Sequence, residues 1–119
     1  MKTMEASDLP PIDLPALGKM LGDDAALVQM ILEKFRAEIQ SDIEALAELA
    51  AGNDLEPIRT LTHRLKGTCS NAQAMPLSNI AKLLQTAMAA GDMSKAQDLI
   101  SALHSERQSL EQYLSDEGF

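Results

Sequence analysis

The fold and the candidate site both depend on one stretch of sequence, LTHRLKG, which spans residues 61–67. A helix turns by about 100° per residue, so residues three and four apart share one face. On that spacing His63 points roughly 180° away from an apolar stripe that we expect to face the core. The stripe consists of Ile58, Leu61, Leu65, Cys69 and Ala72. The stretch therefore predicts an amphipathic helix with one imidazole on its exposed side.

Small and cationic residues surround this histidine on the predicted helix surface. Gly67, Ser70 and Ala74 share its face, and Arg59 and Lys66 flank it. A glycine in the middle of a helix costs about 1 kcal/mol relative to alanine, which suggests that something requires the missing side chain. The alternative is an ordinary surface histidine near a glycine that packs against another helix. The helical pattern alone does not decide between the two.

The distribution of charge favours a site for a negatively charged group. The chain has a formal net charge of −8, yet no Asp or Glu occurs from Pro57 through Gly91. An acid-free stretch around a histidine, in an acidic protein, indicates a group that must carry negative charge. The same span contains four cationic residues: Arg59, Arg64, Lys66 and Lys82.

The sequence around the histidine also resembles a known family. Residues 63–67 read HRLKG and are similar to the His-x-Leu-Lys-Gly signature of histidine-containing phosphotransfer (HPt) domains of multistep phosphorelays. The resemblance runs from about Leu14 to Leu114. It includes LGDD at residues 21–24, LLQ at 83–85 and AGD at 90–92.

This resemblance implies a phosphorelay intermediate that accepts a phosphoryl group on His63 from a receiver-domain aspartate and passes it to another receiver domain. Lys66 would contact the phosphoryl oxygens, and Gly67 would let the receiver domain approach the imidazole. Gln85 would hydrogen-bond the ring nitrogen that is not phosphorylated, which leaves Nε2 facing outward. The remaining partner-binding surface would be formed by Arg59, Arg64, Ser70 and Ala74.

The same resemblance implies the partners and the division of chemistry between them. The partners would be response-regulator receiver domains, including that of a hybrid sensor histidine kinase, and the receiver would supply Mg²⁺ and an aspartate. We therefore expect no metal or cofactor on this chain. No phosphate-binding glycine loop is present, so we expect a phosphohistidine carrier without an ATP site rather than an enzyme. Two positions depart from the family, because Gln73 replaces a frequent glycine and Thr62 replaces a usual alanine.

Helical stripes and capping residues predict an all-α fold. We expect a short helix at about residues 13–22, followed by four longer helices at about 23–52, 54–75, 76–91 and 92–114. Four substantial helices with short connections predict an antiparallel up-down-up-down bundle, with the short N-terminal helix covering one end. Residues 1–11 are expected to form a flexible tail, and residues 12–115 a single domain.

Composition narrows the classes of partner. The negative charge argues against nucleic acid and against an anionic membrane surface. No apolar run approaches the roughly 20 residues of a membrane span, and the N-terminus lacks a signal-peptide pattern. We therefore expect a cytoplasmic, monomeric protein.

Other interpretations remain open from the sequence alone. The chain could be a helical adaptor or dimerisation module in which His63 is never phosphorylated. A kinase dimerisation and phosphoacceptor domain is less favoured, because one chain here supplies enough helices to close a bundle. We expect His104 to be structural and Cys69 to be a small buried hydrophobe. His63 and Cys69 lack the further ligands that a zinc site needs.

Overall fold

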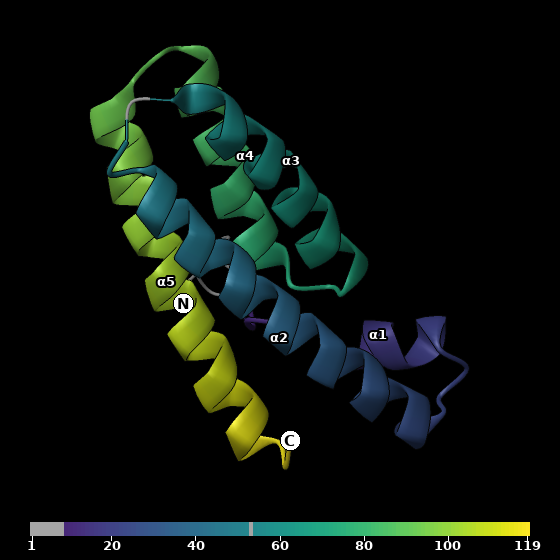
Figure 1. Cartoon of the computed structure of the whole chain (residues 1–119). Helices are drawn as coiled ribbons and strands as arrows, with labels where there is room; N and C mark the ends of the chain where they lie inside the picture. Colours follow the sequence, from purple (N-terminus) through teal and green to yellow (C-terminus); the bar gives the residue numbers. More distant parts are fainter. Residues whose placement is uncertain (1–8, 53) are drawn as a thin grey trace, which may run out of the picture.

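The computed structural model describes residues 9–52 and 54–119, and the regular secondary structure of this part of the chain is α-helix, with no strand (Figure 1). The all-α prediction is therefore confirmed. The predicted tail, residues 1–11, falls largely outside the described residues, and its flexibility stays a prediction. The helices are α1 (Leu14–Met20), α2 (Ala25–Leu49), α3 (Leu55–Asn71), α4 (Met75–Ala89) and α5 (Met93–Asp116).

Aspartate side chains begin four of these helices. Asp13, Asp24, Asp54 and Asp92 each accept a hydrogen bond from a backbone N–H of the first turn, at 3.0–3.1 Å. Such a bond satisfies an amide that has no partner within the helix. Either Asp23 or Asp24 could cap α2 by residue type, and the structure places the cap at Asp24. The remaining helix, α4, begins without a side-chain cap and has Pro76 in its first turn.

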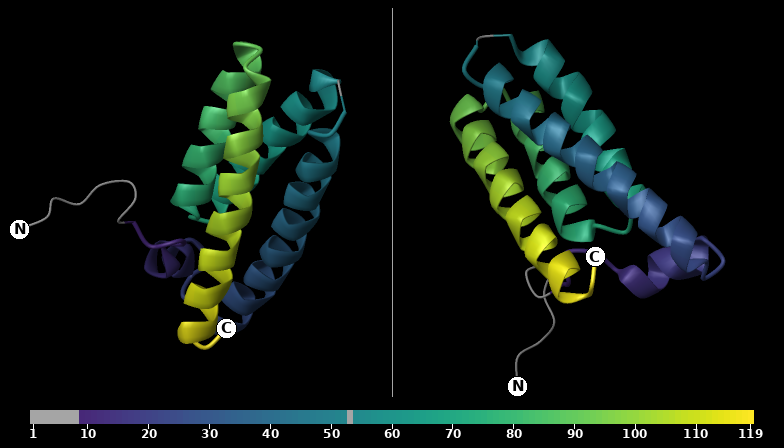
Figure 2. Two further views of the ribbon diagram at one scale, coloured as in Figure 1. Left: turned by 90° about the vertical axis from the view of Figure 1, so that its left-hand side faces the viewer. Right: turned by 60° about the horizontal axis from the view of Figure 1, so that its bottom comes forward.

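Each of the four longer helices packs against two of the other three. α3 packs most extensively against α4, α4 packs against α5, and α2 packs against both α3 and α5 (Figure 2). α1 contacts the beginning of α2, and the Asp13 N–H donates to the carbonyl oxygen of Gln73, at the α3–α4 connection, at 2.9 Å. One hydrophobic core joins all five helices; among its fully buried members are Leu17, Leu46, Leu65, Leu84 and Leu110.

The connection between α3 and α4 contains a residue in the left-handed conformation. Gln73 has φ of +66°, a region in which the Cβ of an L-residue is crowded. Glycine is frequent at this position in the family that the sequence resembles. The backbone gives a physical reason for that preference, because glycine adopts positive φ without this penalty.

Replacing Gln73 with glycine is therefore expected to stabilise the protein. The relief of crowding, about 1–2 kcal/mol, should exceed the extra entropy of glycine in the unfolded chain, about 0.5–1 kcal/mol. Urea unfolding should show a net gain in the free energy of unfolding. Gln40→Gly, at an exposed position within α2, is the matched control and should lose about 1 kcal/mol. A loss of stability in Gln73→Gly would contradict this account of the turn.

Candidate functional site

His63 is exposed on α3, at the edge that packs beside α4. The amide nitrogen of Gln85, on α4, lies 3.1 Å from Nδ1 of His63. The structure thus brings together two residues that are 22 positions apart, as the resemblance implied. The contact occupies one ring nitrogen and leaves Nε2 on the other side of the ring.

The chemistry of Nε2 depends on which end of the Gln85 amide faces the ring. The two ends exchange by a 180° rotation about the last side-chain bond. With the amide oxygen toward the ring, Nδ1 carries the hydrogen and donates it to Gln85. Nε2 then keeps its lone pair and is the nucleophilic nitrogen.

Besides Arg64, which turns toward α2, two cations lie within one turn of His63 along α3. Lys66 follows it and is half-buried, and no ion pair involves Lys66 among residues 9–52 and 54–119. Its backbone carbonyl accepts a hydrogen bond from Ser78 Oγ of α4 at 3.3 Å, which ties the two helices together at this turn. Arg59 precedes His63, is exposed, and lies 4.0 Å from the Glu56 carboxylate. The positive charge of this edge therefore comes mainly from Lys66 and Arg59.

Gly67 lies in open surroundings. A Cβ built on this residue would meet no heavy atom within 4 Å, and its φ is not positive. Neither packing within the chain nor backbone conformation therefore requires glycine here. This excludes the alternative in which Gly67 allows close packing of a neighbouring helix of the same chain. Ser70, one turn further along, is also exposed.

A family model with the description "Hpt domain" matches residues 30–113, which is more than half of the chain. The chain belongs to the Hpt domain family. The match includes all of α3 and α4, and with them His63, Lys66, Gly67 and Gln85. No curated protein and no solved structure matches the chain.

One residue that the sequence placed on the face of this Hpt histidine lies elsewhere. Ala74 is fully buried and is the N-cap of α4. The prediction that Ala74 shares an exposed face with His63 is wrong. α3 ends at Asn71, and the left-handed Gln73 turns the chain before Ala74. The helical spacing could not be extended beyond that end.

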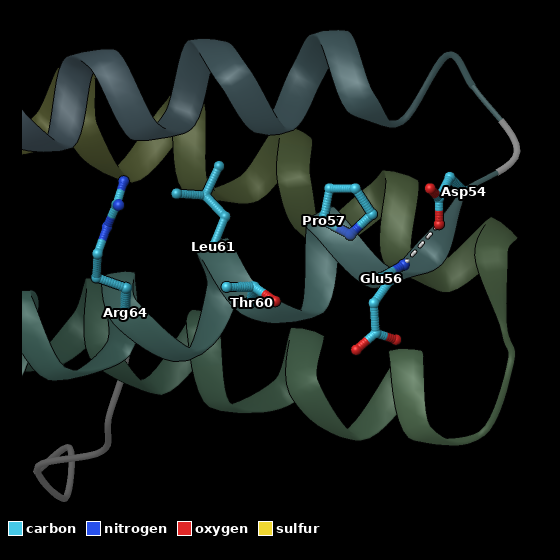
Figure 3. Close-up of a pocket in the computed structure, with 6 residues that line it drawn as sticks. All are labelled: Asp54, Glu56, Pro57, Thr60, Leu61 and Arg64. Carbon is cyan, nitrogen blue, oxygen red and sulfur yellow. Dashed lines mark hydrogen bonds between the residues drawn. The ribbon is translucent and has the colours of Figure 1, made fainter.

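Arg64 points toward α2 and not toward the Hpt histidine's edge. Its Nη2 lies 2.6 Å from Oδ1 of Asp42, whose carboxylate is buried and whose Oδ2 has no hydrogen-bond partner. Figure 3 shows Arg64 with Leu61 and Pro57 on the side of α3 that faces α2, where they line an open pocket of about 520 Å³. The structure gives Arg64 an ion pair within the chain, and the partner contact expected of it stays a prediction.

The acid-free stretch of sequence is consequently not acid-free in space. α2 brings Asp42 to Arg64, and Glu38 lies within 3.5 Å of the Thr68 hydroxyl. Both carboxylates lie on the α2 side of α3, away from Gln85. Carboxylates are therefore sparse on the side of α3 that faces α4, but not on the side that faces α2. Asp42 is the residue that sequence reasoning missed, although its place between Ile39 and Ile43 in the buried stripe of α2 was a visible signal.

Arg64→Ala is expected to destabilise the protein by about 1–3 kcal/mol, because it leaves the Asp42 carboxylate buried without a partner. Arg59→Ala is the matched control; its exposed pair should be worth no more than about 0.5 kcal/mol. Denaturant unfolding of both variants measures the difference. Equal stability would mean that the Asp42–Arg64 pair contributes nothing to the fold.

The other candidate residues lie apart from His63. Cys69 is buried, and burial, followed by the charges of Asp42 and Glu38, raises the pKa of its thiol to about 12. His104 is exposed on α5, where its Nε2 lies 3.4 Å from the Gln108 amide nitrogen.

In the described part of the chain, no three or more His, Cys, Asp or Glu side chains are grouped to hold a metal ion. No described helix is long and apolar enough to cross a membrane.

Proposed function

We propose that the chain is a phosphorelay intermediate that accepts a phosphoryl group on Nε2 of His63 from a receiver-domain aspartate and passes it to another receiver domain. The observation that carries this proposal is the exposed imidazole whose Nδ1 contacts Gln85, within the part of the chain that matches the Hpt family. Histidine phosphotransfer is the chemistry of that family.

The transfer is a substitution at phosphorus. The Nε2 lone pair forms the N–P bond while the O–P bond to the donor aspartate breaks, and the carboxylate leaves with the electron pair. In the second step, a carboxylate oxygen of the acceptor attacks phosphorus and the N–P bond breaks. Such reactions depend on in-line positioning and on stabilising the charge of the equatorial oxygens.

Each neighbour of His63 has a role in this proposal. Gln85 accepts the Nδ1 hydrogen and fixes the plane of the ring. Lys66 supplies positive charge to the phosphoryl oxygens, and Mg²⁺ comes with the receiver domain. The partner docks over Gly67 and Ser70, where no bulky side chain holds it away, and beside Arg59.

The packing of the helices supports a more specific description of the bundle. We propose that α2–α5 form an antiparallel up-down-up-down bundle, because neighbours in sequence also pack together and their connections are short. α1 covers one end, since it contacts α2 and the residue before it bonds to the α3–α4 connection. We propose that the protein is a monomer, because one chain closes the ring of helices.

A transfer assay tests the proposed function. The chain is incubated with a panel of receiver domains carrying ³²P-labelled aspartyl phosphate and Mg²⁺, and the label on the chain is measured. Phosphohistidine is labile to acid and stable to base, so this profile should distinguish it from a phosphoester. Absence of label from every receiver, in reactions that label a reference Hpt domain, would overturn the proposal.

A further inference from the structure

A second surface lies on the face of the molecule opposite the α3–α4 pair. α2 and α5 pack against each other, and each packs against a different member of that pair (Figure 1). A groove of about 610 Å³ runs between α2 and α5. It is lined by Ile43, Glu44, Ala47 and Glu48 of α2 and by Ile100, Ser101, His104 and Ser105 of α5.

The groove has an apolar floor and one acidic wall. Its lining includes Ile43 and Ile100, which are buried, and Ala47, which is exposed. Glu44 and Glu48 form the α2 wall, and no Lys or Arg lines the groove. Neither glutamate takes part in an ion pair within residues 9–52 and 54–119. Two carboxylates beside an apolar floor are therefore available to a cationic partner.

We propose that this groove binds an amphipathic helix of a partner protein, with apolar residues toward the floor and Lys or Arg against Glu44 and Glu48. The lining positions of each wall repeat at the three- and four-residue spacing of a helix, so the groove presents parallel ridges to a third helix. Helices that dock into such grooves use anchors at the same spacing. The acidic wall complements the cations and selects against an acidic helix.

The negative charge of the groove also disfavours two other possible occupants, a second copy of the chain and an anionic membrane surface. A second copy related by a twofold axis would use the same patch and would therefore bring a second Glu44 and Glu48, and no Lys or Arg from the groove lining, to the interface. Like charges placed together across an interface cost free energy. An anionic membrane surface would be repelled for the same reason. The site is independent of the proposed phosphotransfer, because it lies across the molecule from His63.

The probe for this site is a synthetic 14-residue helix with Leu at positions i, i+3, i+4 and i+7 and Lys at the flanking positions. It is titrated into the ¹⁵N-labelled full chain, and amide chemical shifts are followed. We expect shifts at Ala47, Ser101 and Ser105, and little change at His63 and Gln85. The same peptide with Glu in place of Lys should not bind.

Two pairs of variants separate this groove from general attraction to an acidic protein. Ala47→Arg places bulk and positive charge in the groove and should weaken binding at least about tenfold. Ala26→Arg changes the same exposed residue type on the same helix, about 30 Å away, and should bind as the native chain does. Glu48→Lys should also weaken binding, whereas Glu33→Lys, also exposed on α2, should bind nearly as well as the native chain.

Several outcomes would overturn the proposal. Equal affinity of Ala47→Arg and Ala26→Arg would show that the peptide binds elsewhere, as would shifts centred on His63. Equal binding of the Glu-containing peptide would remove the role of the acidic wall. Self-association of the chain that Ala47→Arg abolishes would identify a second copy as the occupant. Thermal melts of each variant accompany the titrations, and Ala47 is exposed, so the fold should be retained.

Discussion

Replacing His63 with glutamine is expected to abolish labelling of the chain by a phosphorylated receiver domain. Glutamine has no nucleophilic nitrogen, so the N–P bond cannot form. The folded structure should change little, because His63 is exposed and its Gln85 contact lies at the surface. Surface substitutions of this kind usually alter stability by less than about 0.5 kcal/mol. The measurement pairs the transfer assay with a thermal melt.

His104→Gln is the matched control for this experiment. It removes the other histidine of the chain, which is also exposed and also contacts a glutamine side chain. This variant should be labelled as the native chain is. If His63→Gln still accepts the label and His104→Gln does not, the assignment of the phosphoacceptor is wrong.

Gly67→Gln is expected to slow transfer from a receiver domain on the order of 100-fold, because a displacement of about 1 Å between reacting groups can cost that much. The new side chain would stand next to the imidazole and hold the partner away. The fold should tolerate it, since a Cβ at Gly67 meets nothing within 4 Å. A rapid-quench assay measures the rate, and complex formation should weaken in parallel.

Two further variants make the Gly67 experiment specific. Gly67→Ala should stabilise α3 by about 1 kcal/mol through helix propensity and should slow transfer less than glutamine does. Ser41→Gln adds a similar side chain at an exposed position of α2 and should leave transfer unchanged. Native rates in Gly67→Gln would mean that the partner does not dock on this face.

Local patterns in the sequence predicted most of the helices. The capping roles of Asp13, Asp54 and Asp92 follow from residue type and position, since each bond joins residues two or three apart. The buried face of α3 was predicted in the same way: Ile58, Leu65, Cys69 and Ala72 are buried, and Leu61 is half-buried. Such features depend on neighbours along one helix.

The features that were not predicted depend on how the helices meet and on where each helix ends. Arg64 was expected on the partner-binding surface and lies in a stretch of sequence without acids, yet Asp42 reaches it from α2. Ala74 appeared exposed because the helical spacing was continued past the end of α3. The contact between His63 and Gln85 was reached only through resemblance to a family, because periodicity does not specify the register between two helices.

The burial of Cys69 has a practical consequence for experiments on both surfaces. It is the single cysteine of the chain, its side chain is inaccessible, and its thiol stays protonated at neutral pH because its pKa is about 12. Thiol reagents react with the thiolate, so we expect them not to label the native chain. A cysteine introduced at Ser70 or at Ser105 would therefore be the only site that takes up a fluorophore or spin label. Each label would report separately on the histidine edge or on the α2–α5 groove, without first removing a native residue from the core.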